Sequence, residues 1–156
     1  MVESKRILEI AKIALEMLEK ETDKQQFLVE YYAAVSALRS VGHVLDKVDK
    51  QHLQGEYSTI DEWWSGIKKN REKSPIFHEF IEKERNQLLK EGAVNMDEDG
   101  SGKYLLIDNM VFPMTELSED MVFVPIENGM YKGEDVRDVI KSAIDWWEEQ
   151  FHLLGI

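Results

Sequence analysis

The chain has 156 residues, of which 43% are apolar and 32% charged, a composition typical of a globular protein. Its net charge of −12 disfavours a general nucleic-acid binder or a protein of acidic membrane surfaces, because phosphate groups repel such a surface. The absence of cysteine excludes disulfides and thiolate chemistry. The N-terminal segment lacks the continuous apolar run of a signal peptide or membrane span, so we expect a single-domain cytoplasmic protein.

Two long helices are expected in the first third of the chain. Residues 3–21 place apolar side chains at a period of 3.6 and consist mostly of good helix formers. Thr22 or Asp23 is expected to cap a second helix, which continues to about Val48. Residues 49–57 are expected to form a polar loop.

The second helix carries two features on different faces. Gly42 lies in its apolar seam, where we expect it to let another backbone come close. Beside the seam, Tyr32, Ser36, Arg39 and His43 follow one another at spacings of four, three and four, so they share a face. This strip is either a polar edge of a helical bundle or part of a binding cleft.

Residues 74–92 show the clearest helix signals, with Ser74 as N-cap and Gly92 as a left-handed terminator. Glu84 falls near the centre of the apolar stripe and Arg85 on its flank, where charges need partners inside the fold. A structural role is expected for Arg85, whose loss would then cost about 3–5 kcal/mol. The expected partners of these two side chains lie on the second helix: Tyr32, Ser36 and Arg39.

Two further helices contain adjacent tryptophans. One is expected at residues 58–73, with Trp63 and Trp64, and the other at residues 134–154, with Trp146 and Trp147. Adjacent helical residues point about 100° apart, so one tryptophan of each pair cannot face the same core as the other. This surplus of apolar surface predicts a homodimer.

The pattern between residues 93 and 132 is of β type, with short runs at Tyr104–Ile107, Val111–Phe112 and Met121–Ile126. The expected fold is therefore mainly α, a four- to five-helix bundle with a small antiparallel β-hairpin or meander before the last helix. Within one domain, residues 1–92 would form the bundle core, residues 93–132 the β-hairpin insertion and residues 133–156 the C-terminal helix.

The acidic segment at residues 97–108 resembles an EF-hand calcium loop. Asp97, Asp99 and Ser101 fall at its first, third and fifth positions, and Asp108 at its twelfth. The side chain of Asp108 is too short to coordinate calcium well with both carboxylate oxygens, and the segment that leaves the loop is strand-like rather than helical. We therefore expect an acidic turn that binds no metal. The four histidines are isolated, which predicts no zinc cluster, and no cofactor motif is present.

Residues 27–92 resemble small bacterial helical proteins related to the HEPN superfamily. The stretch "AVSALRSVGHVLDKV … DEWW … FHEFIEKERNQLLKEG" carries the resemblance, which is specific at Arg39-Ser40, Arg85-Asn86 and Lys90-Glu91-Gly92. It implies a dimeric helical bundle. In HEPN ribonucleases, an Arg, a polar residue and a later His form the catalytic motif at the dimer interface.

Arg85 and Asn86 match the start of that motif, but Lys90 or Glu91 stands where the His belongs. Cleavage of RNA would use an imidazole that titrates near neutrality, whereas lysine is largely protonated there. His43 could supply an imidazole from the second helix. We therefore expect a catalytically degenerate HEPN-like domain, acting as a homodimeric or partner-binding module. The alternatives are a toxin-type ribonuclease with a non-standard base and a sensor of small ligands or ions.

Overall fold

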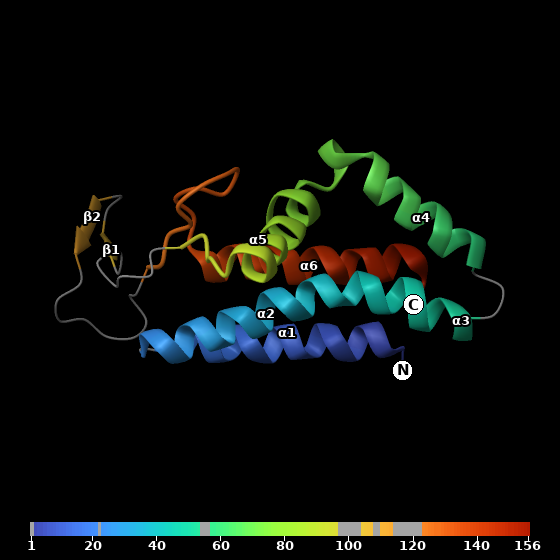
Figure 1. Cartoon of the computed structure of the whole chain (residues 1–156), viewed down its shortest axis with the longest axis horizontal. Helices are drawn as coiled ribbons and strands as arrows, with labels where there is room; N and C mark the ends of the chain where they lie inside the picture. The colour runs from blue at the N-terminus through green and yellow to red at the C-terminus, as the bar shows by residue number, and fades with distance from the viewer. Residues whose placement is uncertain (1, 22, 54–56, 97–103, 108–109, 114–122) are drawn as a thin grey trace.

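Three long helices lie side by side and form the body of the molecule (Figure 1). They are α1 (Glu3–Lys20), α2 (Lys24–Val44) and α6 (Val136–Leu154). Their buried side chains join those of the other helices in one hydrophobic core. None of the helices in the described part of the chain has the length and apolar character needed to cross a bilayer. The structure is a computed structural model, and it describes residues 2–21, 23–53, 57–96, 104–107, 110–113 and 123–156.

The second helix is capped as predicted, since the Asp23 carboxylate accepts a hydrogen bond of 2.9 Å from the backbone N–H of Gln26. Its predicted end near Val48 is wrong. The chain continues through a π-helical turn, η1 (Leu45–Asp49), into the short helix α3 (Lys50–His52), so part of the predicted polar loop is helical.

Asp49 explains why the helix continues. Its carboxylate is buried and accepts backbone hydrogen bonds from Glu3 and Ser4, each 2.8 Å long. These are two of the free N–H groups at the start of α1, which no side chain at the preceding Val2 caps. The end of the α2–η1–α3 helix is therefore tied to the beginning of α1.

The remaining helices cross this body (Figure 1). The predicted helix at 74–92 is the continuous pair of η3 (Ile76–Glu82), which is π-helical, and α5 (Lys83–Glu91). It ends at Gly92 with a φ of 63°, as predicted. The Ser74 side chain does not cap it, because only its backbone carbonyl accepts bonds there, from Phe77 and His78. The preceding elements are α4 (Tyr57–Lys69) and a short 3₁₀ turn, η2 (Arg71–Lys73).

The paired tryptophans pack against one another inside the chain. Trp64 and Trp147 are buried, and their neighbours Trp63 and Trp146 are half-buried. The ring centroids are 5.4 Å apart between Trp63 and Trp64 and 4.7 Å apart between Trp146 and Trp147, and Phe77 contacts both pairs. The apolar surface that motivated the expected dimer is thus largely used within one chain.

Gly42 makes room for two of these rings rather than for a backbone. A Cβ atom at this position would lie 2.9 Å from a ring carbon of Trp147 and 2.9 Å from one of Trp64. Both rings are held in the aromatic cluster, so they cannot move away freely.

Replacing Gly42 with alanine is therefore expected to destabilise the protein by about 1 kcal/mol, since overpacking of about 1–3 kcal/mol outweighs a gain in helix propensity of about 1 kcal/mol. Gly66 of α4 is the matched control, because nothing lies within 4 Å of a Cβ built there. Gly66→Ala should leave stability unchanged or raise it. Denaturant melts followed by tryptophan fluorescence would check both, and a stabilised Gly42→Ala protein would contradict the packing described.

The β part of the predicted fold needs correction, because no sheet packs on the helical body in the described residues. The strands β1 (Tyr104–Ile107) and β2 (Met110–Pro113) form a short antiparallel ladder with one another, drawn beyond the end of the helices in Figure 1.

The predicted strand at 121–126 makes only isolated bridges in its described part. Its backbone bonds instead to the start of α6: Val124 N–H donates to the Asp135 carboxylate at 2.9 Å, and Val124 C=O accepts from Val136 at 2.9 Å. Asp135 is also the N-cap of α6, so the predicted start at Glu134 is slightly early.

Candidate functional site

A pocket of about 250 Å³ lies between α2 and α5. One side of it is formed by α2, through Ser36, Arg39 and His43 of the polar strip together with Ser40. Arg85 and Leu89 of α5, four residues apart, form the other. We call this pocket the arginine cleft, and its lining residues are Ser36, Arg39, Ser40, His43, Arg85 and Leu89. The structure thus brings together Ser36, Arg39, His43 and Arg85 from the residues predicted by sequence.

Neither arginine of the cleft forms an ion pair with a carboxylate among the described residues. The Arg39 guanidinium lies over the ring of Phe77, 5.6 Å from its centroid, which is a cation–π contact. Arg85 donates a hydrogen bond of 3.0 Å from Nη1 to Oδ1 of the neighbouring Asn86. The cleft therefore holds two guanidiniums whose charge no described carboxylate neutralises by direct contact, in a protein of net charge −12.

The two guanidiniums also influence one another. Burial lowers the pKa of Arg39, Glu82 raises it, and the like charge of Arg85 lowers it again. Arginine remains protonated at physiological pH in spite of such shifts. The repulsion between Arg39 and Arg85 would be relieved by an anion between them.

Glu84 has other partners than those expected on α2. Its carboxylate is only 1% exposed and accepts hydrogen bonds from the Tyr31 hydroxyl at 2.6 Å and the Asn95 side-chain amide at 3.1 Å. The expected contacts with Tyr32, Ser36 or Arg39 are wrong. Tyr32 is 37% exposed and does not line the cleft.

Asn95 extends this network to the segment before α6. Its side-chain amide also donates to the Asn128 carbonyl at 2.7 Å, and its Oδ1 accepts from the Asn128 N–H at 3.0 Å. The network of Tyr31, Glu84, Asn95 and Asn128 thus connects α2, α5 and the chain that leads into α6. It fixes how α5 crosses α2, and thereby positions Arg85 over the α2 strip.

The Tyr31 hydroxyl makes stability dependent on alkaline pH. Burial, and then the charge of Glu84, raise its pKa well above the ordinary value of 10.0. A group whose pKa is higher in the folded state than in the unfolded state contributes its full stabilisation at pH values below the unfolded-state pKa. This stabilisation is lost as the pH rises through the folded-state pKa. We expect the free energy of unfolding to fall above about pH 10, by up to about 1.4 kcal/mol per pH unit. Denaturant melts between pH 8 and 11 should show this slope, and Tyr31→Phe should reduce it; an equal slope in both proteins would contradict the assignment.

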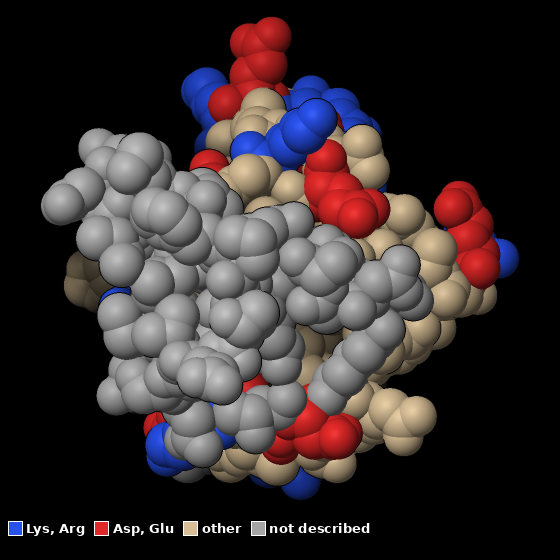
Figure 2. Space-filling view, turned by 90° about the vertical axis from the view of Figure 1, so that its left-hand side faces the viewer, with Lys and Arg blue, Asp and Glu red and all other residues tan. Residues whose placement is uncertain are grey.

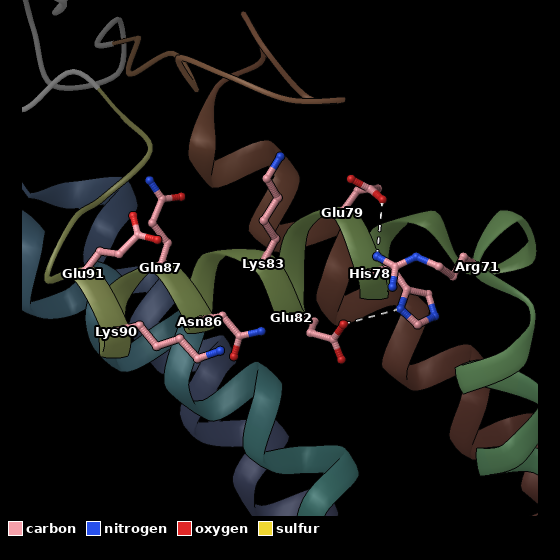
Figure 3. Close-up of a pocket in the computed structure, with 9 residues that line it drawn as sticks. All are labelled: Arg71, His78, Glu79, Glu82, Lys83, Asn86, Gln87, Lys90 and Glu91. Carbon is pink, nitrogen blue, oxygen red and sulfur yellow. Dashed lines mark ion pairs between the residues drawn. The ribbon is translucent and has the colours of Figure 1, made fainter.

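The other residues of the HEPN-like motif lie in a different pocket. Asn86 and Lys90 line a pocket of about 620 Å³ formed mainly by η3 and α5 (Figure 3). Adjacent helical positions point about 100° apart, so Lys90 diverges from the cleft that Leu89 lines. The lysine at the place of the motif histidine is therefore not part of the arginine cleft, whereas His43 is.

Asp97, Asp99, Ser101 and Asp108 of the calcium-like loop lie outside the described residues. Among the residues with a described position, no three or more His, Cys, Asp or Glu side chains form a cluster that could hold a metal ion.

The structural role expected for Arg85 has no supporting ion pair among the described residues, where its side chain donates a hydrogen bond to Asn86. We therefore expect Arg85→Gln to change the free energy of unfolding by less than about 1 kcal/mol, as for other substitutions at half-exposed positions. A urea melt beside the parent protein measures this. A loss of about 3 kcal/mol or more would restore the structural role.

The chemistry of the arginine cleft is that of anion binding. Guanidinium groups present forked N–H donors to carboxylate or phosphate oxygens, and the hydroxyls of Ser36 and Ser40 and the imidazole of His43 can add further donors. Comparisons of the chain with protein-family models, curated proteins and solved structures give no match.

Proposed function

We propose that this protein is a cytoplasmic HEPN-like domain that acts as a homodimeric or partner-binding module and does not cleave RNA. In this proposal the arginine cleft receives an anionic group of the bound chain. The observation that carries it is the convergence of Arg39 and Arg85 on one cleft, with no carboxylate among the described residues paired to either.

Exposed apolar side chains near the cleft support an interface on this face. Leu89 lines the cleft and is 63% exposed. On α2, one turn and two turns before Ser36, Tyr32 and Val29 are also exposed. Arginine and aromatic side chains are enriched at protein interfaces, and the residues that contribute most of the binding energy cluster near the centre of the interface.

The overall charge supports a protein partner rather than RNA. Acidic and basic side chains are interspersed on the described part of the face shown in Figure 2. The net charge of −12 disfavours contact with the phosphate backbone of RNA over a broad surface. A local pair of arginines in an acidic protein suits one anionic group, such as a glutamate or aspartate side chain of a second chain.

Light scattering tests the homodimeric form of the proposal. We expect a dimer mass at tens of micromolar. Leu89→Glu should shift the mass toward monomer, because it replaces an apolar side chain of the proposed interface with a charged one. Leu153 of α6 is 68% exposed and lies outside the cleft, so Leu153→Glu is the matched control and should remain dimeric. A monomer mass for the parent protein would remove the homodimer.

The second candidate function is a ribonuclease, which the position of His43 favours. Its imidazole lines the same cleft as Arg85, so an arginine and a potential general base occur together there. The test incubates a labelled single-stranded RNA with the parent protein, Arg85→Gln and His43→Gln. The module proposal predicts no cleavage by any of them.

Cleavage by the parent that is lost in both variants would establish the ribonuclease instead. His52→Gln is the control for this assay, because His52 is exposed on α3 and does not line the cleft. Cleavage that persists in all three variants would not come from the arginine cleft and would indicate a contaminating nuclease.

A further inference from the structure

His78 is a buried histidine with one ring nitrogen that no described group satisfies. The residue is only 4% exposed, and no described group forms a hydrogen bond with its Nδ1. It belongs to η3, the π-helical part of the 76–91 helix. Wider π-helical turns occur frequently at functional sites.

The other ring nitrogen fixes the tautomer of this imidazole. Nε2 lies 2.8 Å from the backbone carbonyl of Ile67, which can only accept a hydrogen bond. In the neutral ring Nε2 therefore carries the proton, and Nδ1 presents a lone pair. Histidines that bind metals show this same arrangement, in which the second ring N–H donates to a carbonyl or carboxylate that orients the ring.

The Nδ1 lone pair faces a carboxylate. Oε1 of Glu82, one turn later on the same helix, lies 3.7 Å from Nδ1, and Figure 3 shows both groups directed toward one another in the 620 Å³ pocket. Two electron-pair donors at this separation repel one another unless a positive centre, either a proton on Nδ1 or a metal ion, lies between them. Two ligands of a tetrahedral ion, each at about 2.0–2.1 Å, are about 3.4 Å apart, so a small side-chain rotation would let both bind one ion.

We propose that His78 Nδ1 and the Glu82 carboxylate bind one divalent transition-metal ion of the zinc type. An imidazole and a carboxylate suit zinc and its neighbours, whereas calcium and magnesium prefer oxygen ligands alone. With two protein ligands, the site leaves coordination positions open toward the pocket. This inference is independent of the function proposed for the arginine cleft.

Two of the basic side chains in the pocket wall are directed elsewhere. The Arg71 guanidinium lies opposite Glu79, with 3.7 Å between Nη2 and Oε1. The Lys83 ammonium reaches Gly129, where it would lie 2.9 Å from a Cβ built on that residue. Figure 3 shows Lys83 pointing away from the His78–Glu82 pair. The Lys83 charge is therefore directed away from the proposed site, and the Arg71 charge faces the Glu79 carboxylate.

Calorimetric titration with zinc chloride at neutral pH tests the proposal. We expect saturable binding of one ion per chain, weakened by about 10-fold or more in Glu82→Gln, a range typical of groups that support a metal site. His78→Gln should abolish it, since the glutamine amide can still donate to Ile67 C=O but has no nitrogen at the Nδ1 position. Glu91→Gln is the control, because Glu91 lines the same pocket on the last turn of α5.

Nuclear magnetic resonance of the histidine ring nitrogens gives a second measurement that does not need the buried variant. Zinc should shift Nδ1 of His78 and leave the nitrogens of His43, His52 and His152, which are exposed, unchanged. No saturable binding up to about 1 mM would overturn the site. Binding that is equally strong in Glu82→Gln, with shifts confined to the exposed histidines, would also overturn it.

Discussion

Replacing Glu84 with alanine is expected to lower the free energy of unfolding by about 3–5 kcal/mol. The change removes the shared acceptor of the Tyr31 hydroxyl and the Asn95 amide, and a buried donor left without an acceptor costs about 1–3 kcal/mol. It also leaves a cavity at a position only 1% exposed. A urea melt measures the loss, and a change below 1 kcal/mol would contradict the central position of this network.

Glu84→Gln gives a sharper version of the test. A glutamine can accept from the Asn95 amide through its oxygen and donate through its NH₂ group to the Tyr31 oxygen, but the Tyr31 hydroxyl proton then loses its charged acceptor, so this variant should also be destabilised. Removing the Tyr31 hydroxyl should recover part of that loss, because the buried donor without an acceptor is gone. The double variant Tyr31→Phe/Glu84→Gln is therefore expected to be more stable than the sum of the single changes predicts.

The second large effect is expected at Asp49, where alanine should cost about 2–4 kcal/mol. Its carboxylate accepts one buried and one part-buried backbone hydrogen bond at the start of α1. A hydrogen bond to a charged group contributes about 1.5–3 kcal/mol, and the part-buried one is expected to contribute less because water can replace it. Helical circular dichroism and a urea melt would check the loss of stability. Asp61, whose exposed carboxylate pairs with Lys50 on the surface, is the control. Asp61→Ala should cost less than about 1 kcal/mol, and similar effects at both positions would contradict the capping role of Asp49.

Local spacing was sufficient to predict one wall of the arginine cleft. Ser36, Arg39 and His43 share a face because of the helical period alone, and the signals at Asp23 and Gly92 correctly placed a helix start and a helix end. The same period identified Arg85 as a flank residue. What spacing could not supply was the crossing of α5 over α2, which brings Arg85 to that wall.

The residues that set this crossing carry no local signal. Asn95 follows the helix that Gly92 ends, and its role depends on Asn128, which is distant in the sequence. Asp49 falls in the predicted polar loop, because the sequence around it does not show that its carboxylate binds the first residues of α1. The β-type pattern at 121–126 predicts a strand, but the start of α6 forms the hydrogen bonds that a neighbouring strand would have formed.

His78 illustrates a signal that was present but ambiguous. An isolated histidine on an apolar helix is usually a satisfied core residue, and the sequence shows neither its bond to Ile67 nor the distance to Glu82. A spacing of four between a histidine and a carboxylate on one helix is the one local feature that could have drawn attention to the pair.

The central claim is that Arg39 and Arg85 together bind an anion. A titration with inorganic pyrophosphate at low ionic strength tests it most directly, with the Nε–H resonances of the two arginines as the readout. We predict saturable shifts of both resonances, with the remaining shift much reduced in Arg39→Gln and in Arg85→Gln and unchanged in Lys90→Gln, which alters only the neighbouring pocket. Resonances that do not move up to about 10 mM, or shifts that survive in the Arg39→Gln/Arg85→Gln protein at other sites, would contradict the claim.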